Sequence, residues 1–421
     1  METVAIEKVR EGQVEKAVRR SIAGLGPLPK PMAPGARVLI KPNLVGAFDW
    51  RTGATTNPAV VESLAEWAWE ACAADVAIGD GSGHGQHTSD AFRLNGYEEM
   101  ARRCKARLVD LNADPVEVPC PQGKVVKSLP ISRTALEADW LISVPVLKTH
   151  FQAGVTLSLK NMKGILSWRG KRKLHFVGLH QAIVDLNTVM APHLIVVDGT
   201  VGHEGLGPVM GEPAGAGLVL AGTNRVAVDA VCCRVMGMEP NEVPHIALAA
   251  AAGMGPIQPG HILVVGEALE AVRRPFKRGE INLSQVCAAP GLIVIEGTTC
   301  SGCNISLALA FKEMQADGEL AHIAERAGPL VFVYGEDADL SRVPDGAVVL
   351  HVGKCQREAK HLGPWVPGCP PGLSPIKDTL REAAGFPRRG LPPELWQEGF
   401  EDEAGADPDD EGRAPAVSQS R

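Results

Sequence analysis

Short apolar runs alternate with amphipathic helical patterns along most of this chain. The run 36–44 (ARVLIKPNL) predicts a buried strand that ends in a polar loop. Residues 59–73 repeat apolar positions with a period of 3.6, and the preceding Asn57 and Pro58 are helix-start signals. Such alternation is typical of α/β proteins whose mainly parallel sheet is covered on both faces. Further strands are predicted over 75–83, 138–150, 193–202 and 261–267, and a buried helix over 227–237.

A second, smaller unit is predicted after residue 288. Apolar runs predict its strands, and a helical pattern at 304–315 follows the first of them. The segment 268–290, which contains RRPFKRGE, is typical of a linker. After Pro387 the periodicity is lost, and the acidic end of the chain has almost no large apolar residues. The predicted strands of this unit are 291–297, 328–336 and 347–353, and the predicted organisation is an α/β domain over 1–270, a small α/β domain over 288–388 and a disordered tail over 398–421.

Composition narrows the classes of protein that fit. The chain has 421 residues, 45% of them hydrophobic, and a formal net charge of −7. A dedicated nucleic-acid binder would show a basic domain, so we expect no nucleic-acid partner. No apolar run approaches the roughly 18–20 residues that span a bilayer, and the charged N-terminal segment lacks the apolar stretch of a signal peptide. We therefore expect a cytoplasmic protein without a membrane span.

The ten cysteines divide into two groups. In a reducing compartment they are not expected to form a disulfide framework. Six lie in or near apolar, mostly helical patterns or a short loop, where cysteine usually acts as a small core residue. The other four fall in the small unit, after strands or in loops rich in glycine and proline. The expected core residues are Cys72, Cys104, Cys120, Cys232, Cys233 and Cys287, and the remaining four are Cys300 and Cys303 (TTCSGCN), Cys355 (HVGKCQRE) and Cys369 (VPGCPPG).

Four thiolates suit an iron–sulfur cluster or zinc. A structural zinc site usually pairs one CxxC with a second pair, but here the second pair is split between Cys355 and Cys369. A redox-active CxxC would use Cys300 and Cys303 alone and leave the other two unexplained. A 4Fe–4S cluster accepts cysteines from separate loops, so it is the favoured reading, with Zn²⁺ and redox thiols as alternatives.

The segments EGTTCSGCNISL, GKC and VPGCPP resemble those that hold the proximal 4Fe–4S cluster in the small subunit of nickel–iron hydrogenases. The small subunit of respiratory complex I has a similar proline-flanked cysteine. The resemblance covers residues 291–385 and implies a flavodoxin-like domain that binds the cluster at the ends of its strands. The interval from Cys303 to Cys355 is short for that family, and the chain has no counterpart of the nickel-bearing subunit, so hydrogenase activity is not implied. The implied ligands are Cys300, Cys303, Cys355 and Cys369.

Residues 36–255 resemble the family called domain of unknown function 362. The family implies a fold and no settled reaction, and its members often carry iron–sulfur motifs. The stretches that carry the resemblance are VLIKPNLVG, TTNPAVVESL, IGDGSG, ADWLISVPVLKTH, GVTLSLKNMKGI, VVDGTVGHEGLGP and LAGTNRVAVDAV.

Polar residues follow the predicted strands of the large domain. If the sheet is parallel, these loops meet at its carboxyl edge, where ligands bind in open α/β sheets. Lysines and histidines with two aspartates would suit a carboxylate or phosphate substrate, with Lys or His as acid–base groups. The catalytic candidates are Lys41, Asp80, Lys148, His150 and Asp198, and the substrate-binding candidates are Asn43, Ser82, Lys160, Asn161 and Lys163.

Each candidate has a plainer interpretation. Lysines at strand exits can simply face solvent, and GDGSGHG can be only a turn, since it lacks the spacing of known phosphate-binding loops. His175 and His180 follow the basic run WRGKRK and are expected at the surface. That run would be a solvated loop or a docking site for an acidic partner such as a ferredoxin. Asp229 lies in an apolar helix and either anchors a loop donor or belongs to the site.

Together these patterns favour an iron–sulfur oxidoreductase or electron-transfer protein. Its single 4Fe–4S cluster would exchange electrons with a small anionic substrate or a redox partner protein at the large domain. One alternative is a non-redox enzyme of the racemase or lyase type that acts on a carboxylate or phosphate and has a structural metal. Another is a binding or assembly module for a second iron–sulfur protein.

Overall fold

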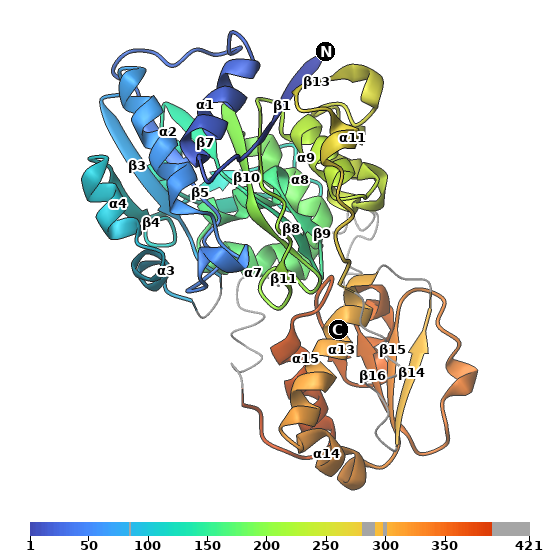
Figure 1. The fold of residues 1–421 in the computed structure, drawn as a ribbon. Coiled ribbons are helices and arrows are strands. Elements are labelled where there is room, and N and C mark those ends of the chain that lie inside the picture. The colour runs from blue at the N-terminus through green and yellow to red at the C-terminus, as the bar shows by residue number, and fades with distance from the viewer. Residues whose placement is uncertain (84–85, 280–290, 298–300, 390–421) are drawn as a thin grey trace, which may run out of the picture.

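The computed structural model describes residues 1–83, 86–279, 291–297 and 301–389. Two α/β units lie next to each other, a larger one drawn in blue to yellow and a smaller one in orange to red (Figure 1). Within these residues the larger unit contains an 11-stranded sheet and the smaller unit a 4-stranded sheet. The predicted α/β class and the two sheets are therefore confirmed. None of the helices in the described ranges is long and apolar enough to cross a membrane.

The large sheet is mixed but mostly parallel. Its order is β13-β1-β12-β10-β7-β2-β3-β4, with β8, β9 and β11 attached through β10. The strands β7, β2, β3 and β4 at one side of the sheet are parallel, while β12 runs antiparallel to both β10 and β1. A separate hairpin, β5 with β6, lies outside this sheet. The strands are β1 (Glu2–Lys8), β2 (Arg37–Lys41), β3 (Asp75–Asp80), β4 (Arg107–Asp110), β5 (Pro115–Pro119), β6 (Ser128–Ser132), β7 (Trp140–Ser143), β8 (Val146–His150), β9 (Gly154–Thr156), β10 (Leu194–Glu204), β11 (Glu212–Pro213), β12 (Leu218–Gly222) and β13 (Ile262–Gly266).

Helices cover both faces of this sheet, as the uninterrupted apolar strands predict. Successive residues of a strand point to opposite faces. Val38 and Ile40 pack with α1 and α2, whereas Leu39 between them packs against α8 on the other face. The helices are α1 (Val14–Gly24), α2 (Pro58–Glu70), α3 (Thr88–Leu94), α4 (Tyr97–Arg103), α5 (Arg133–Glu137), α6 (Ser158–Asn161), α7 (Trp168–Val177), α8 (Leu179–Val189), α9 (Arg225–Val235), α10 (Pro244–Ala251) and α11 (Leu269–Val272), and the 3-10 helix η2 (Met162–Ile165) follows α6.

Side-chain caps start two of the predicted helices. Asn57 accepts a hydrogen bond from the backbone N–H of Ala59, and Pro58 occupies the first turn of α2. Asn224 accepts from the N–H groups of Val226 and Ala227 at the start of α9. Local sequence therefore sets both helix starts.

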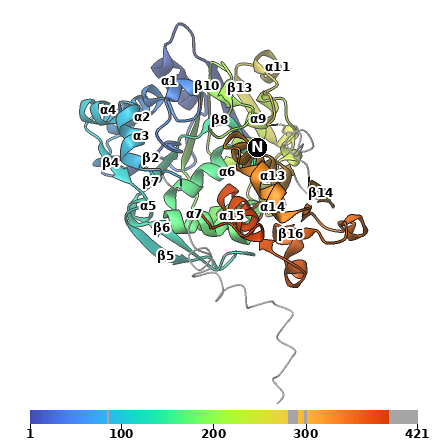
Figure 2. The same cartoon turned by 90° about the horizontal axis from the view of Figure 1, so that it is seen from below.

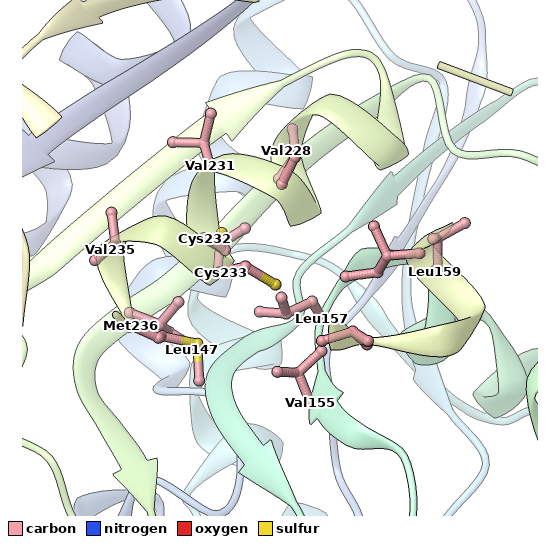
Figure 3. Close-up of a cluster of buried hydrophobic side chains, with 14 of the residues drawn as sticks. Leu147, Val155, Leu157, Leu159, Val228, Val231, Cys232, Cys233, Val235 and Met236 are labelled. Carbon is pink, nitrogen blue, oxygen red and sulfur yellow. The ribbon is translucent and has the colours of Figure 1, made fainter. Parts of the chain in front are cut away.

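The helix α9 forms the centre of a large apolar cluster (Figure 3). Cys232 and Cys233 lie there among side chains of β8, β9 and α6, and Cys104 and Cys120 are also buried. The predicted core role is thus confirmed for these four. It is wrong for Cys72, which is exposed because the chain turns away after α2 in a left-handed conformation. Cys287 lies outside the described residues.

Three local expectations differ from the structure. The predicted strand 138–150 is two strands, β7 and β8, because Pro145 between them has no N–H to donate to a ladder. The N-terminal strand β1 was not predicted, since its charged residues mask the pattern. Residues 268–279 of the expected linker instead carry α11 and the buried Phe276, which pack on the core of the larger unit. The rest of the linker and the tail 398–421 lie outside the described residues.

The small unit is a parallel sheet with helices against it. Its order is β14-β15-β16-β17, and all three pairings are parallel. Phe311 of α13 meets Phe332 of β15 edge-on, with ring centroids 4.7 Å apart, inside the core of this unit. The three predicted strands and the predicted helix are confirmed as β14 (Leu292–Glu296), β15 (Leu330–Tyr334), β16 (Val348–Val352) and α13 (Ser301–Ala316). The unit also contains β17 (Trp365–Val366), α14 (Glu319–Ala327) and α15 (Leu373–Ala383).

Candidate functional site

A buried ion pair lies at the carboxyl ends of β2 and β3. Lys41 Nζ is 2.7 Å from Asp80 Oδ1, and it also donates to Asn161 Oδ1 at 3.2 Å. Asn43 Nδ2 donates to the same Asn161 oxygen at 3.1 Å. Burial lowers the pKa of Lys41, and the Asp80 carboxylate opposes this shift. The structure therefore brings four of the predicted site residues into one network.

The backbone packs tightly against this hydrogen-bonded network. Gly164 lies so near that a Cβ there would collide with Asp80 Oδ1 and Lys41 Nζ. Asp80 Oδ2 accepts from the N–H of Leu44 at 2.6 Å. Lys41 is fully buried and Asp80 nearly so. The pair is thus held in place from several sides, which suits a rigid support for neighbouring loops.

Ser82 and Asp198 are engaged in loop contacts. Ser82 is buried and donates to the carbonyl of Leu44 at 2.8 Å. Asp198 accepts from the N–H of Asn57 at 2.7 Å and from Thr200, so it ties the start of α2 to β10. Burial raises the pKa of Asp198, and the hydrogen bonds from Asn57 and Thr200 oppose that. Both side chains have structural partners, and their predicted roles in substrate binding and catalysis remain predictions.

Lys148 and His150 lie on one face of β8. Lys148 Nζ donates to the carbonyl of Ala54 at 2.6 Å. Burial, followed by the charge of Lys160, holds the pKa of Lys148 well below its usual value. His150 Nδ1 accepts from the N–H groups of Gln152 and Ala153, and burial lowers the pKa of this histidine too. His150 is therefore neutral with its proton on Nε2, which makes that atom a hydrogen-bond donor.

Lys160 is the common neighbour of the basic side chains. Burial is the main cause that lowers the pKa of His150 and, on α7, α8 and α10, of His175, His180 and His245, and the charge of Lys160 adds to each of these shifts. Burial lowers the pKa of Lys160 itself to about 7. Within the described part of the chain Lys160 forms no ion pair. A small anion at this place would find charge and donors together.

The helix α7 turns two basic side chains inward. Lys163 Nζ and His175 Nε2 are 2.8 Å apart. Lys171 Nζ donates to Asn112 Oδ1 at 2.7 Å and to the carbonyl of Gly81 at 2.8 Å, and burial lowers the pKa of Lys171 to about 8. The expectation of a solvated loop is therefore wrong for Lys171, and the expectation of surface histidines is wrong for His175 and His180, both partly buried.

Of the two roles predicted for Asp229, the structure shows the first, an acceptor that anchors a loop. It accepts from the N–H of Ser158 at 2.7 Å and from that of Leu159 at 3.0 Å, at the first turn of α6. Burial raises the pKa of Asp229 to about 7, against these hydrogen bonds. Asp229 therefore anchors the segment that carries Lys160.

Three of the four predicted cluster ligands lie at the carboxyl edge of the small sheet. Cys303 is near the start of α13, Cys355 is in the 3-10 helix η6 (Lys354–His361) after β16, and Cys369 follows β17. Backbone bonds join the last two loops, since Lys354 N donates to the carbonyl of Gly368 at 2.9 Å. Cys303 is buried, Cys369 half-buried and Cys355 exposed.

Glycine leaves room beside one of these sulfur atoms. Gly353 has φ +87°, and a Cβ there would lie 3.1 Å from Cys303 Sγ. Cys300 lies outside the described residues, and within those residues no group of three or more His, Cys, Asp or Glu side chains is arranged to hold a metal ion. The loops bring Cys303, Cys355 and Cys369 to one edge of one sheet, and the cluster itself remains a prediction.

The loop that carries Cys369 contacts α7 and α8 of the larger unit, and the following helix α15 is drawn near α7 in Figure 2. Cys369 N donates to the carbonyl of His175 at 2.8 Å, and the carbonyl of Cys369 accepts from Leu179 N at 3.0 Å. Gln152 Nε2, close to His150, donates to Ser306 Oγ at 3.0 Å and to the carbonyl of Pro371 at 3.2 Å. Segments far apart in the sequence thus place the two predicted sites side by side.

Comparison with known families finds one similarity within the larger unit. Residues 38–234 match the model described as "Domain of unknown function (DUF362)". This match covers just under half of the chain and lies within the larger unit, which we call the DUF362 domain after it. A thylakoid-associated protein, sll1697, from Synechocystis sp. is 28% identical over 251 residues, which are 58% of this chain and 77% of the relative. The similarity to this relative extends over more residues than the DUF362 match does.

Two solved structures show only weak likeness. The lactate racemase apoprotein from Thermoanaerobacterium thermosaccharolyticum covers 91% of this chain and 90% of its own, with 13% identity and a TM-score of 0.33. A structural-genomics protein from Thermotoga maritima covers 49% of this chain and 54% of its own, about half its length, with 12% identity and a TM-score of 0.30. At these scores neither assigns a fold or a function to the DUF362 domain.

Sequence reasoning missed several basic residues of the DUF362 domain site. Lys171 and His175 are four residues apart and share one face of α7, so a helical reading of WRGKRKLHFV would have paired them. His245 had no local signal, because it stands in an alanine-rich helix. His203 and Glu204 are the last two residues of β10 and have other partners: His203 contacts the carbonyl of Thr52, and Glu204 accepts from Lys277 N. His84 lies outside the described residues.

Proposed function

We propose that this protein is an iron–sulfur oxidoreductase or electron-transfer protein. A 4Fe–4S cluster on Cys300, Cys303, Cys355 and Cys369 would exchange single electrons with a small anionic substrate, or with a redox partner, at the DUF362 domain. The small unit would then correspond to the cluster domain that it resembles in hydrogenase small subunits, without hydrogenase activity. We also propose that the protein acts in the cytoplasm.

One observation carries this proposal. The backbone of Cys369 is hydrogen-bonded on both sides to the DUF362 domain, at His175 and Leu179. His175 in turn contacts Lys163, and Lys160 lies close enough to lower its pKa. A ligand held by these lysines would therefore sit next to the cysteine edge, which is the arrangement that short-range electron transfer needs.

The DUF362 domain residues would bind and orient the substrate. Lys160 supplies charge for an anionic group, and His150 offers its Nε2 proton as a donor. The buried Lys41–Asp80 pair holds Asn161, next to Lys160 on α6, in position. A neutral Lys160 can also take a proton near neutral pH, because burial lowers its pKa to about 7. Protons and electrons would thus be supplied from two sides of the same ligand.

The direct test is purification without oxygen, followed by iron and sulfide assays and by optical and EPR spectra before and after dithionite. We expect about four irons and four sulfides per chain. Cys369→Ser should lose most of them, whereas Cys72→Ser, at an exposed cysteine far from the small unit in sequence, should keep them. Stoichiometric zinc without iron would contradict the proposal.

A non-redox enzyme of the lyase or racemase type is the second candidate. It is favoured by the same low pKa of Lys160, since a neutral buried amine is a good base for removing a proton from a substrate. The metal site would then be structural. A cluster whose spectrum does not change between oxidised and dithionite-treated protein would favour this candidate over the first.

A further inference from the structure

Two stacked histidines beside Lys160 have ring nitrogens without partners. His180 of α8 and His245 of α10 are 5.7 Å apart between centroids and lie within 15° of parallel. His245 is completely buried, yet neither of its ring nitrogens has a hydrogen-bond partner in the described part of the protein. His180 Nδ1 is buried and unpartnered as well. Buried polar atoms are nearly always hydrogen-bonded, so these three call for an explanation.

The groups around the pair are basic or neutral donors. Burial and then the charge of Lys160 lower the pKa of His180 to about 4, and burial lowers that of His245. Both rings are therefore neutral, and each keeps one N–H donor. Asp229 on α9, a helix that packs against α10, accepts from the backbone of Ser158 and Leu159.

Other unpartnered polar atoms lie on the segment that leads to Lys160. Thr156 Oγ1 and Ser158 Oγ are buried and have no partner among the described residues. Thr156 is paired with Lys148 across the β8–β9 ladder, so its side chain lies on the same face as Lys148. Buried polar atoms without a partner among the described residues thus lie on β9, α6, α8 and α10.

A bound anion would account for these unpartnered polar atoms better than a bound metal ion would. A metal site would need a third ligand with His180 and His245, and the described residues form no such group of His, Cys, Asp or Glu. Lys160 would also repel a cation. An oxyanion would instead accept from the imidazole N–H groups and pair with the ammonium, which satisfies both kinds of group at once.

We propose that Lys160, His180 and His245 form the binding subsite for an oxyanion group, a carboxylate or a phosphate, of a small-molecule ligand. The proposal rests on the proposed function in that it assigns these residues to the same anionic site, and it adds the histidine pair to it. Lys160 provides the charge, and the two histidines act as neutral donors that select oxygen geometry.

The test is isothermal titration calorimetry of the full-length protein, as purified without oxygen, at pH 7 with inorganic phosphate and, separately, with malonate. We expect at least one of the two to bind, and the comparison shows whether the group is a phosphate or a carboxylate. Lys160→Gln should abolish binding, and His245→Leu should weaken it about tenfold through the lost donor. His261→Gln, at an exposed histidine far from the site, should bind like the wild type.

The outcomes separate the two proposals. If neither anion binds the wild type, or if His245→Leu and His180→Asn both bind as the wild type does, the histidine subsite is overturned. Loss of binding in Lys160→Gln alone would leave the anionic site of the proposed function standing. Absence of iron would overturn the redox proposal without touching the calorimetric result. Should His245→Leu fail to fold, His180→Asn decides, because His180 is partly exposed and tolerates a polar replacement.

Discussion

Two clusters of basic side chains lie in the DUF362 domain, one around the buried Lys41 and one around the partly buried Lys160, and their charges are balanced differently. Around Lys41, a carboxylate at 2.7 Å and two oxygen acceptors satisfy the ammonium. Around Lys160, neutral histidines and other lysines are the neighbours, and within the described residues no acid forms an ion pair with it. The first cluster is complete in itself, whereas the second gains most from a ligand that brings negative charge.

The strongest test of this comparison removes the acid from the balanced cluster. Asp80→Asn should destabilise the protein by about 3–5 kcal/mol, because Lys41 would be left buried without its counter-ion. Urea denaturation followed by circular dichroism measures the change. The matched control is Asp75→Asn at the opposite end of β3, where an exposed pair with Arg107 predicts a loss below about 1 kcal/mol. Equal losses of stability in Asp80→Asn and Asp75→Asn would mean that the buried Lys41–Asp80 pair matters no more than an exposed ion pair.

A smaller effect should follow from crowding the same pair. Gly164→Ala puts a Cβ against Asp80 Oδ1 and Lys41 Nζ, so we expect a loss of about 1–3 kcal/mol. Gly260→Ala serves as control, since a Cβ there meets no atom within 4 Å. The thermal unfolding midpoint of the two variants gives the comparison. A midpoint for Gly164→Ala equal to that of the control would show that the network can move aside.

The smallest effect is expected at the cluster around Lys160, where the stability of the folded protein should depend on pH. The pKa of Lys160 is lowered from 10.5 to about 7 in the folded protein. Between these values the unfolded chain holds the extra proton, so the destabilising contribution is full below about pH 7 and fades as the pH rises towards 10.5. The wild type should therefore gain stability relative to Lys160→Met over this range, by at most about 1.4 kcal/mol per pH unit.

Urea denaturation of both proteins at pH 7, 8 and 9 measures this trend, with Lys16→Met as the matched change at an exposed lysine of α1. For Lys16→Met the stability curves should run parallel to those of the wild type. If the stability of the wild type relative to Lys160→Met stays constant or falls as the pH rises, Lys160 is charged and balanced, and the comparison between the clusters fails.

Much of the fold could be predicted from the sequence, because strands buried on both faces leave continuous apolar runs and helices leave caps. β2, β3 and α2 appear close to where the pattern indicates. The division of 138–150 into β7 and β8 at Pro145 and the antiparallel direction of β12 could not be predicted in this way. The direction of a strand depends on which strands it pairs with, and these lie far away in the sequence. The site was predicted in part: Lys41, Asp80 and Asn161 meet because their strands are parallel neighbours or because a connection returns to the same edge.

The amino-acid pattern by itself determined the apolar strands, the polar loops after them, and a set of cysteines confined to the small unit. The tertiary structure alone decided which basic side chains are balanced and which are not. Desolvation and Coulomb interactions depend on spatial neighbours, and Lys160 meets His180 and His245 only because α6, α8 and α10 pack together. For the same reason, only the docked small unit shows Cys369 beside His175.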